Sequence, residues 1–321
     1  MISDGETIAF ERLQLKNFDV FFYGLGFESR STKIIASLPT PAKIFALQMP
    51  ASNLHAYARN LQFARTKHHR VIVDFQAFLS SELPKLFEKR VGPLRIGFDV
   101  SSVNRLMLIG LLNELALLVQ VNDSIELFYC PAAYFEPKWL FPQIEKLGPV
   151  DSLLSGFNSD PSKPLCLIFG MGFEAGVSMG IISQLEPSVA YGLWGTGIDE
   201  RFSDAVKRAN FNFQFPGFNT RILSYSVRDP KGAFELLENV VYGLTRDHRV
   251  IIVPMGPKLF TALAALVGMK YFGDAAVWRV QHSIGEQSDS FPGESCVAAI
   301  LDVSLLKSYA ERVRAFTKIA I

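Results

Sequence analysis

Short apolar runs of strand length alternate along the first half of this chain with longer segments whose apolar residues recur at helical spacing. This alternation is typical of a parallel sheet whose strands are joined by crossover helices. The runs predict strands at Asp19–Tyr23, Lys43–Leu47, Arg70–Phe75, Arg95–Val100 and Ile125–Tyr129. Helices are predicted between them, at Ser31–Leu38, Leu54–Lys67, Leu79–Lys89 and Asn104–Leu118.

The second half repeats this order. Strands are predicted at Leu165–Phe169, Val189–Trp194, Arg221–Val227, Arg249–Val253 and Ala276–Gln281, and helices at Val177–Leu185, Arg201–Ala209, Lys231–Leu244 and Lys258–Met269. A proline-rich connection, 131–164, contains a short amphipathic piece at Trp139–Leu147, and Val303–Lys318 reads as a final amphipathic helix. We therefore expect an α/β fold with two tandem Rossmann-like halves, 1–148 and 149–321, the second carrying the C-terminal helix, with mostly parallel sheets and helices on both faces.

One six-residue pattern, aromatic-Gly-x-Gly-Phe-Glu, follows the first strand of each half, at 23–28 and 169–174. Glycines in such a turn can adopt positive φ or let another backbone approach, and a following helix start favours anions. The ligand contacts predicted from this pattern are Gly24, Gly26, Glu28, Arg30, Ser31, Gly170, Gly172 and Glu174. A third glycine at dinucleotide spacing is absent, so the glycines could equally serve only strand–helix packing.

A second repeated feature follows the fourth strand of each half. Aligning Val100 with Val253 places Arg105 opposite Lys258, in the first turn of the next helix. A cation there opposes the helix dipole, so an anion should compensate it. Ser101 and Ser102, and Gly256 in the second half, complete the predicted site. The alternative is that Ser101 or Ser102 is an ordinary N-cap and that Arg105 pairs with Asp99 or Glu28.

Composition narrows the classes of partner. With 49% hydrophobic and 20% charged residues, the chain is globular, and its net charge of +1 gives no reason to expect a long nucleic-acid duplex. Three distant cysteines without CxxC spacing suggest neither disulfides nor zinc, and the adjacent histidines 68 and 69 make a poor metal chelate. We expect no metal and no cofactor. The polar N-terminus and the absence of a membrane-length apolar run predict a cytoplasmic protein without membrane contact.

The turns at Gly24–Ser31, Ser101–Arg105 and Met255–Lys258 resemble those of the CRISPR-associated Rossmann-fold (CARF) sensors and of related fused, two-unit sensors of prokaryotic anti-phage defence. The resemblance implies a cyclic or linear oligonucleotide messenger in a cleft between the halves, and a protein partner that carries an effector. This chain departs from the family because its later turn holds less threonine and glycine, and because Pro254 and Pro257 stiffen the second copy.

Three functions remain open from the sequence. In a sensor, Arg30, Arg105 and Lys258 would neutralise phosphates, Ser101 and Ser102 would donate hydrogen bonds, and Glu28 and Glu174 would orient ribose or arginine. A hydrolase of a nucleotide phosphodiester or N-glycosidic bond would use Glu28, Glu174 or Asp99 as acid and base. A non-catalytic subunit of a larger complex would use the duplicated fold as an interaction platform.

Overall fold

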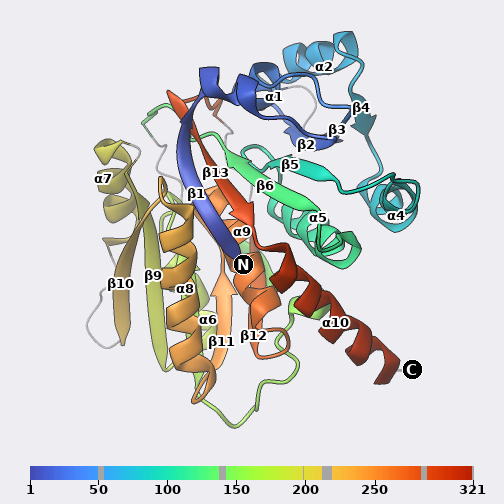
Figure 1. Cartoon of the computed structure of the whole chain (residues 1–321). Coiled ribbons are helices and arrows are strands. Elements are labelled where there is room, and N and C mark those ends of the chain that lie inside the picture. The colour runs from blue at the N-terminus through green and yellow to red at the C-terminus, as the bar shows by residue number, and fades with distance from the viewer. Residues whose placement is uncertain (50–53, 137–141, 198, 212–218, 283–287, 320–321) are drawn as a thin grey trace. The chain divides into compact units, whose positions relative to one another are not determined.

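The computed structural model describes residues 1–49, 54–136, 142–197, 199–211, 219–282 and 288–319 (Figure 1). The chain divides into two compact units, and each is considered by itself. The first unit comprises 1–133 together with 288–321, and the second comprises 134–287. The structure thus divides the chain differently from the expected boundary between 148 and 149, because the C-terminal segment belongs with the first unit.

The first unit is built on one mixed sheet. Its strands lie in the order β1 (Ile2–Ala9), β13 (Ser295–Leu301), β6 (Ser124–Tyr129), β5 (Arg95–Asp99), β2 (Val20–Leu25), β3 (Lys43–Gln48) and β4 (Arg70–Ile72). The strands from β6 to β4 are parallel, whereas β13 is antiparallel to both β1 and β6. Numbered by their order along the chain, the five parallel strands lie in the sheet in the order 3-2-1-4-5, which is the order of Rossmann-like folds.

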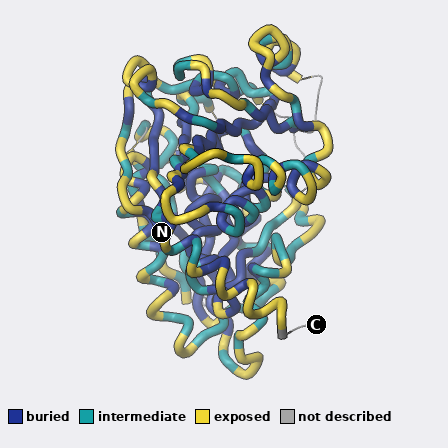
Figure 2. The backbone as a smooth tube through the Cα atoms, turned by 45° about the vertical axis from the view of Figure 1, so that its right-hand side comes forward, coloured by how far each residue is buried: buried dark blue, intermediate teal, exposed yellow. Residues whose placement is uncertain are grey.

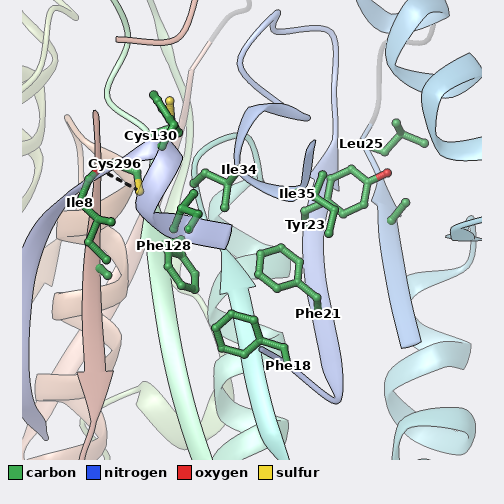
Figure 3. Packing of buried hydrophobic residues seen from close by; sticks show 14 of the residues in the cluster. Ile8, Phe18, Phe21, Tyr23, Leu25, Ile34, Ile35, Phe128, Cys130 and Cys296 are labelled. Atoms are coloured by element: carbon green, nitrogen blue, oxygen red, sulfur yellow. Dashed lines mark hydrogen bonds between the residues drawn. The ribbon is translucent and has the colours of Figure 1, made fainter. Parts of the chain in front are cut away.

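Helices cover both faces of this sheet because successive residues of β2 point to opposite sides. Phe21 and Tyr23 pack toward η1 (Phe10–Leu15), α1 (Lys33–Ser37) and α2 (Tyr57–Thr66), as Figure 3 shows in part. Phe22 packs on Phe78 on the other face. That face carries α3 (Phe75–Ala77), the π-turn η2 (Phe78–Glu82), α4 (Leu83–Glu88), α5 (Arg105–Leu118) and, against α5, α10 (Val303–Ile319).

The second unit has the same parallel order. Its sheet runs β10 (Thr220–Ser226), β9 (Val189–Thr196), β8 (Leu165–Gly170), β11 (Arg249–Val253), β12 (Ala275–His282) and β7 (Ile144–Pro149), with β7 antiparallel. One face packs α6 (Val177–Leu185) and α7 (Glu200–Ala209), and α8 (Pro230–Thr245) and α9 (Lys258–Lys270) follow β10 and β11. The short η3 (Ser152–Leu154) contacts β12 and α9. The central strands β2 and β8 are buried at every residue. Figure 2 shows buried segments of the backbone in dark blue, with exposed segments in yellow at the outside.

The predicted fold class, two Rossmann-like halves with mostly parallel sheets, is confirmed. Three strands were missed: β1, β7 and β13. The amphipathic piece expected at 139–147 ends in the strand Ile144–Pro149; residues 139–141 lie outside the described residues. The C-terminal helix was expected with the second half, but the buried Tyr309 of α10 donates its hydroxyl hydrogen to Asn113 of α5, in the first unit.

Elements of the first unit also differ in length from their predictions, and the end of β4 has a clear cause. The strand expected at Arg70–Phe75 ends at Ile72, because Asp74 caps the next helical turn by accepting a hydrogen bond from the Ala77 N–H at 2.9 Å. The helical segment expected from Leu79 consequently begins at Phe75. Within the described part of the chain, no helix is both long and apolar enough to cross a membrane.

Candidate functional site

The carboxyl end of the central strand is the natural ligand position in each unit. In the first unit β2 lies between β3 and β5, and in the second β8 lies between β9 and β11. The strand order reverses there, so the crossover helices leave on opposite faces and open parallel sheets bind ligands at that edge. Both predicted turns of each half follow these strands, and the fold therefore gathers the predicted residues at one edge within each unit.

The first glycine of each repeated turn is required by close backbone approach. A Cβ atom on Gly24 would lie 2.7 Å from the Ser102 carbonyl carbon and 2.8 Å from the Val103 nitrogen. A Cβ on Gly170 would collide with the Met255 carbonyl oxygen and the Phe260 ring. These two glycines bring the turn after the first parallel strand against the turn after the fourth, which favours their packing role.

The second glycines differ between the units. A Cβ on Gly26 would make ordinary contacts, 3.4 Å from Ser31 Oγ and 3.6 Å from the Ser102 oxygen. A Cβ on Gly172 would lie 3.0 Å from the Gly256 nitrogen, and Gly256 itself has a φ of +69°. The second unit is therefore the tighter of the two at this edge.

Glu28 is held inside the first unit by two side chains. Arg30 donates from Nη2 to Glu28 Oε1 at 3.1 Å and from Nε to Oε2 at 3.3 Å, and Ser102 Oγ donates to Oε2 at 2.6 Å. Arg30 Nη1 also donates to the Cys130 carbonyl at 2.8 Å. The predicted residues Glu28, Arg30 and Ser102 are thus brought together, and Glu28 pairs with Arg30.

Arg30 is only 7% exposed, so the ion pair with Glu28 offsets the cost of burying the guanidinium charge. Burial by itself would lower the pKa of the guanidinium, but the Glu28 carboxylate outweighs it and raises that pKa above its ordinary value. Ser31 follows and is buried as well, and its hydroxyl has no hydrogen-bond partner among the described residues. The side chains of Arg30 and Ser31 therefore belong largely to the interior of the turn.

Asp99 ends β5 and holds the turn that follows. Its Oδ1 accepts hydrogen bonds from the Ser101 N–H at 2.9 Å and from the Ser101 hydroxyl, whose oxygen accepts from the Cys130 N–H at 2.7 Å. Asp99 is 1% exposed, and its Oδ2 has no partner within the described ranges. Burial raises the pKa of Asp99 to about 7, against the opposing effects of Ser101 and Arg30. Asp99 is therefore a buried turn-holding carboxyl group.

Arg105 and Lys258 are the first residues of α5 and α9, so the predicted position of a cation in that turn is confirmed in both units. Both side chains are half-buried. The alternative in which Ser101 or Ser102 caps α5 is wrong, because Asn104 is the N-cap and accepts from the Met107 N–H at 2.9 Å. Pro257, which precedes α9, offers no side-chain cap.

Glu174 occupies the same place in its turn as Glu28. The Glu174 carbonyl accepts from the Val177 N–H at 3.4 Å, and the Glu28 carbonyl accepts from the Ser31 N–H at 3.0 Å. The two turns therefore share this hydrogen bond, but Gly176 has a φ of +78° whereas Arg30, at the equivalent position, is not in the left-handed region. The use of Glu28 and Glu174 as an acid–base pair stays a prediction.

A duplicated asparagine was missed by the sequence analysis. Asn60 of α2 donates from Nδ2 to the carbonyls of Gly26 and Glu28, both at 2.9 Å. Asn210, at the end of α7, donates from Nδ2 to the Gly172 carbonyl at 2.8 Å. Both residues are at most 7% exposed. Each helix after the second parallel strand thus holds the glycine turn of its unit. Asn60 is the fourth residue of α2 whereas Asn210 follows the last residue of α7, so no shared helix position marked the pair in the sequence.

Comparisons with known proteins find similarity in structure and not in sequence. Neither a family model nor a curated protein sequence matches the chain. Among solved structures, the chain is similar to a type III CRISPR defence DNA nuclease activated by cyclic oligoadenylate. The superposition has a TM-score of 0.48 at 10% sequence identity, and it covers 86% of this chain and 68% of the nuclease.

Proposed function

We propose that the protein binds a nucleotide-type anionic ligand at the carboxyl edges of its two sheets and acts as a sensor or signalling subunit. The observation that carries the proposal is the repeated cation at the start of the helix after the fourth parallel strand, Arg105 on α5 and Lys258 on α9. A cation at a helix N-terminus opposes the macrodipole, so its presence in both units calls for an anion at that edge.

Phosphate is the anion that this edge suits. In the first unit Glu28 pairs with Arg30, so we assign the phosphate contact to Arg105 at the start of α5. Guanidinium and ammonium groups bind phosphate through charge-assisted hydrogen bonds. Two equivalent edges in one chain provide two such phosphate contacts, which suits a messenger built from linked nucleotides, as the resemblance to the CARF sensors implies.

Binding without turnover is favoured over hydrolysis. A general acid or base must reach the reacting group of the substrate. Asp99 is 1% exposed, and both carboxylate oxygens of Glu28 are engaged by Arg30 and Ser102. Neither carboxyl group is presented for catalysis in the first unit, so the ligand would act as a signal that is passed to a protein partner.

A thermal-shift screen tests this function. The pure protein is melted with mono-, di- and cyclic oligonucleotides, and the screen is repeated on Arg105→Ala and Lys258→Ala. A ligand at a hundredfold excess over its dissociation constant should stabilise the native protein by about 2.7 kcal/mol. Both substitutions should reduce that gain, whereas Lys43→Ala should not, because Lys43 is an exposed cation at the start of β3, on the amino side of the sheet.

The fate of the ligand separates the remaining functions. Nucleotide recovered intact after incubation supports a sensor, whereas conversion of the nucleotide would establish the hydrolase. A shift that persists in both Arg105→Ala and Lys258→Ala would place the ligand elsewhere. The absence of any shift would contradict the proposed function and leave the interaction subunit.

A further inference from the structure

The segment by which the chain re-enters the first unit lies against the turn after β2. This return strap, residues 288–294, accepts a hydrogen bond at the Ser290 carbonyl from the Arg30 N–H at 3.0 Å. It is also fixed beyond β6, where Gly293 N–H donates to the Pro131 carbonyl at 2.8 Å and Pro292 forms a bridge with Ala132. The strap therefore borders the candidate ligand turn.

One side chain of the strap, Asp289, is bound there through both of its carboxylate oxygens. The Ser29 N–H donates to Asp289 Oδ1 at 2.7 Å, and the Ser29 hydroxyl donates to Oδ2 at 2.5 Å. Arg59 of α2 donates from Nη2 to the Ser29 oxygen at 3.0 Å, which brings a guanidinium to the same place. A backbone N–H, a hydroxyl and a nearby guanidinium are the donors that also bind a phosphate group.

This contact differs from the other aspartate–serine pairs of the first unit. Asp302 accepts from the N–H and the hydroxyl of Ser304, two residues away, and so closes a local turn at the start of α10. Asp289 and Ser29 are 260 positions apart, and the carboxylate reaches the candidate turn from another part of the chain. Ser29 and Asp289 are half-buried and Arg59 is exposed, so solvent and ligand can reach the group.

We propose that Ser29 and Arg59 form a phosphate-binding subsite that Asp289 occupies in the unliganded chain. A phosphate group of the ligand replaces the Asp289 carboxylate on the Ser29 N–H and hydroxyl, and the return strap is released. The ligand class rests on the proposed function, whereas the subsite itself is testable with an inorganic anion. Because the strap is the covalent return from the second unit, its release gives ligand binding a structural output.

Titration calorimetry with inorganic pyrophosphate tests the subsite. The protein is compared with Asp289→Ala and with Asp302→Ala, which removes a carboxylate bonded to a serine in the same way but away from the turn. The apparent pyrophosphate affinity equals the affinity of the open subsite multiplied by the fraction of chains in which the subsite is open. If Asp289 fills the subsite in nine-tenths of the chains, Asp289→Ala should raise the pyrophosphate affinity about tenfold. Asp302→Ala should bind pyrophosphate as the unaltered protein does.

Two further variants identify the donors. Adding Ser29→Ala or Arg59→Ala to Asp289→Ala should abolish the gain in pyrophosphate affinity. In the unaltered protein, saturating pyrophosphate should also speed hydrogen exchange of the Arg30 amide, because that amide loses the Ser290 carbonyl when the strap leaves. Asp289→Asn replaces Asp289→Ala if the latter does not melt cooperatively.

Unchanged pyrophosphate affinity in a folded Asp289 variant would overturn the subsite, as would a gain that survives both donor substitutions. The result is separable from the nucleotide screen. Pyrophosphate binding through Ser29 and Arg59 together with a failed nucleotide screen retains the subsite and rejects the proposed function. If nucleotide binding needs Arg105 but Asp289→Ala gains no pyrophosphate affinity, the proposed function is retained and the subsite is rejected.

Discussion

At the scale of single residues, Asp99 shows how burial and hydrogen bonding have opposite effects on the pKa of a carboxyl group in the candidate site. Its two hydrogen bonds from Ser101 favour the ionised form, but burial outweighs them and raises its pKa from 3.8 to about 7. The folded protein therefore binds a proton at Asp99 over a pH range in which the unfolded chain has lost it. Stability is linked to pH through that difference.

Replacing Asp99 should change the pH dependence of stability with a defined sign. The contribution of Asp99 is fully present below pH 3.8 and is lost as the pH rises to about 7. Relative to Asp99→Asn, the free energy of unfolding of the unaltered protein should therefore fall between these values and then level off. Urea unfolding from pH 4 to 8 measures it. Asp302→Asn is the control, because the Ser304 hydroxyl lowers the pKa of Asp302. The contribution of Asp302 is lost only as the pH falls below 3.8, so its replacement should leave the pH dependence from pH 4 to 8 unchanged.

The paired asparagines predict equal losses in the two units. Asn60→Ala leaves the buried carbonyl of Gly26 and the half-buried carbonyl of Glu28 without their amide donor, and Asn210→Ala does the same to Gly172. Each substitution should lower the free energy of unfolding of its unit by about 2 kcal/mol in urea titrations. The exposed Asn122→Ala is the control and should change little. Unchanged stability in Asn60→Ala would refute its role in holding the turn.

At the scale of elements, two turns meet at the end of each central strand. Gly24 packs on the backbone of the turn after β5, and Gly170 packs on the turn and helix after β11. The same sequence pattern thus produces the same approach in both units. The second glycine does not follow the pattern, since a Cβ on Gly172 would lie 3.0 Å from the Gly256 nitrogen whereas a Cβ on Gly26 would make only ordinary contacts.

Alanine substitutions should separate these glycines. Gly24→Ala forces backbone atoms apart and should cost about 2 kcal/mol of unfolding free energy, because overpacked atoms must shift. Gly26→Ala meets only ordinary contacts and should cost about 1 kcal/mol or less. Gly243→Ala, in open space on α8, should instead stabilise by up to about 1 kcal/mol through helix propensity. Equal losses for Gly24→Ala and Gly26→Ala in chemical unfolding would contradict this account.

At the scale of the whole molecule, the chain leaves the first unit at Ala133 and returns at Ser288. The returning segment supplies β13, which pairs with β1 and β6, and α10, which packs on α5. The second unit is continuous in sequence, whereas the first is assembled from both ends of the chain.

This assembly predicts which fragments fold. A fragment of residues 134–287 contains a complete sheet with both helix layers and should show a cooperative thermal transition in circular dichroism. A fragment of residues 1–148 lacks β13 and α10, so the edge of β6 and a face of α5 lose their partners. It should melt without cooperativity, and joining residues 288–321 to residues 1–133 should restore the transition. A cooperative transition in the 1–148 fragment would contradict the division.

The candidate site shows what local sequence could predict. Gly24, Glu28, Asp99 and Arg105 were identified because repeated residues follow apolar runs, and parallel strands bring such turns to one edge. The pairing of Glu28 could not be predicted, because the sequence allowed either a ligand or an arginine as its partner and only the folded structure places Arg30 against it. Asn60 and Asn210 carried no local signal, because a polar residue in a helix reads as solvent-exposed until the neighbouring turn is in place.

The sequence by itself determined the parallel strands, their crossover helices and the duplicated turns, because buried apolar runs and glycine patterns are local. Tertiary structure decided the rest. The edge strands β1 and β7 have polar, partly exposed sequences that show no strand periodicity, and β13 and α10 acquired their unit only through pairing with β6 and packing on α5. The contact between Asp289 and Ser29 also depends on the tertiary structure, because the two residues are 260 positions apart and no sequence pattern links them.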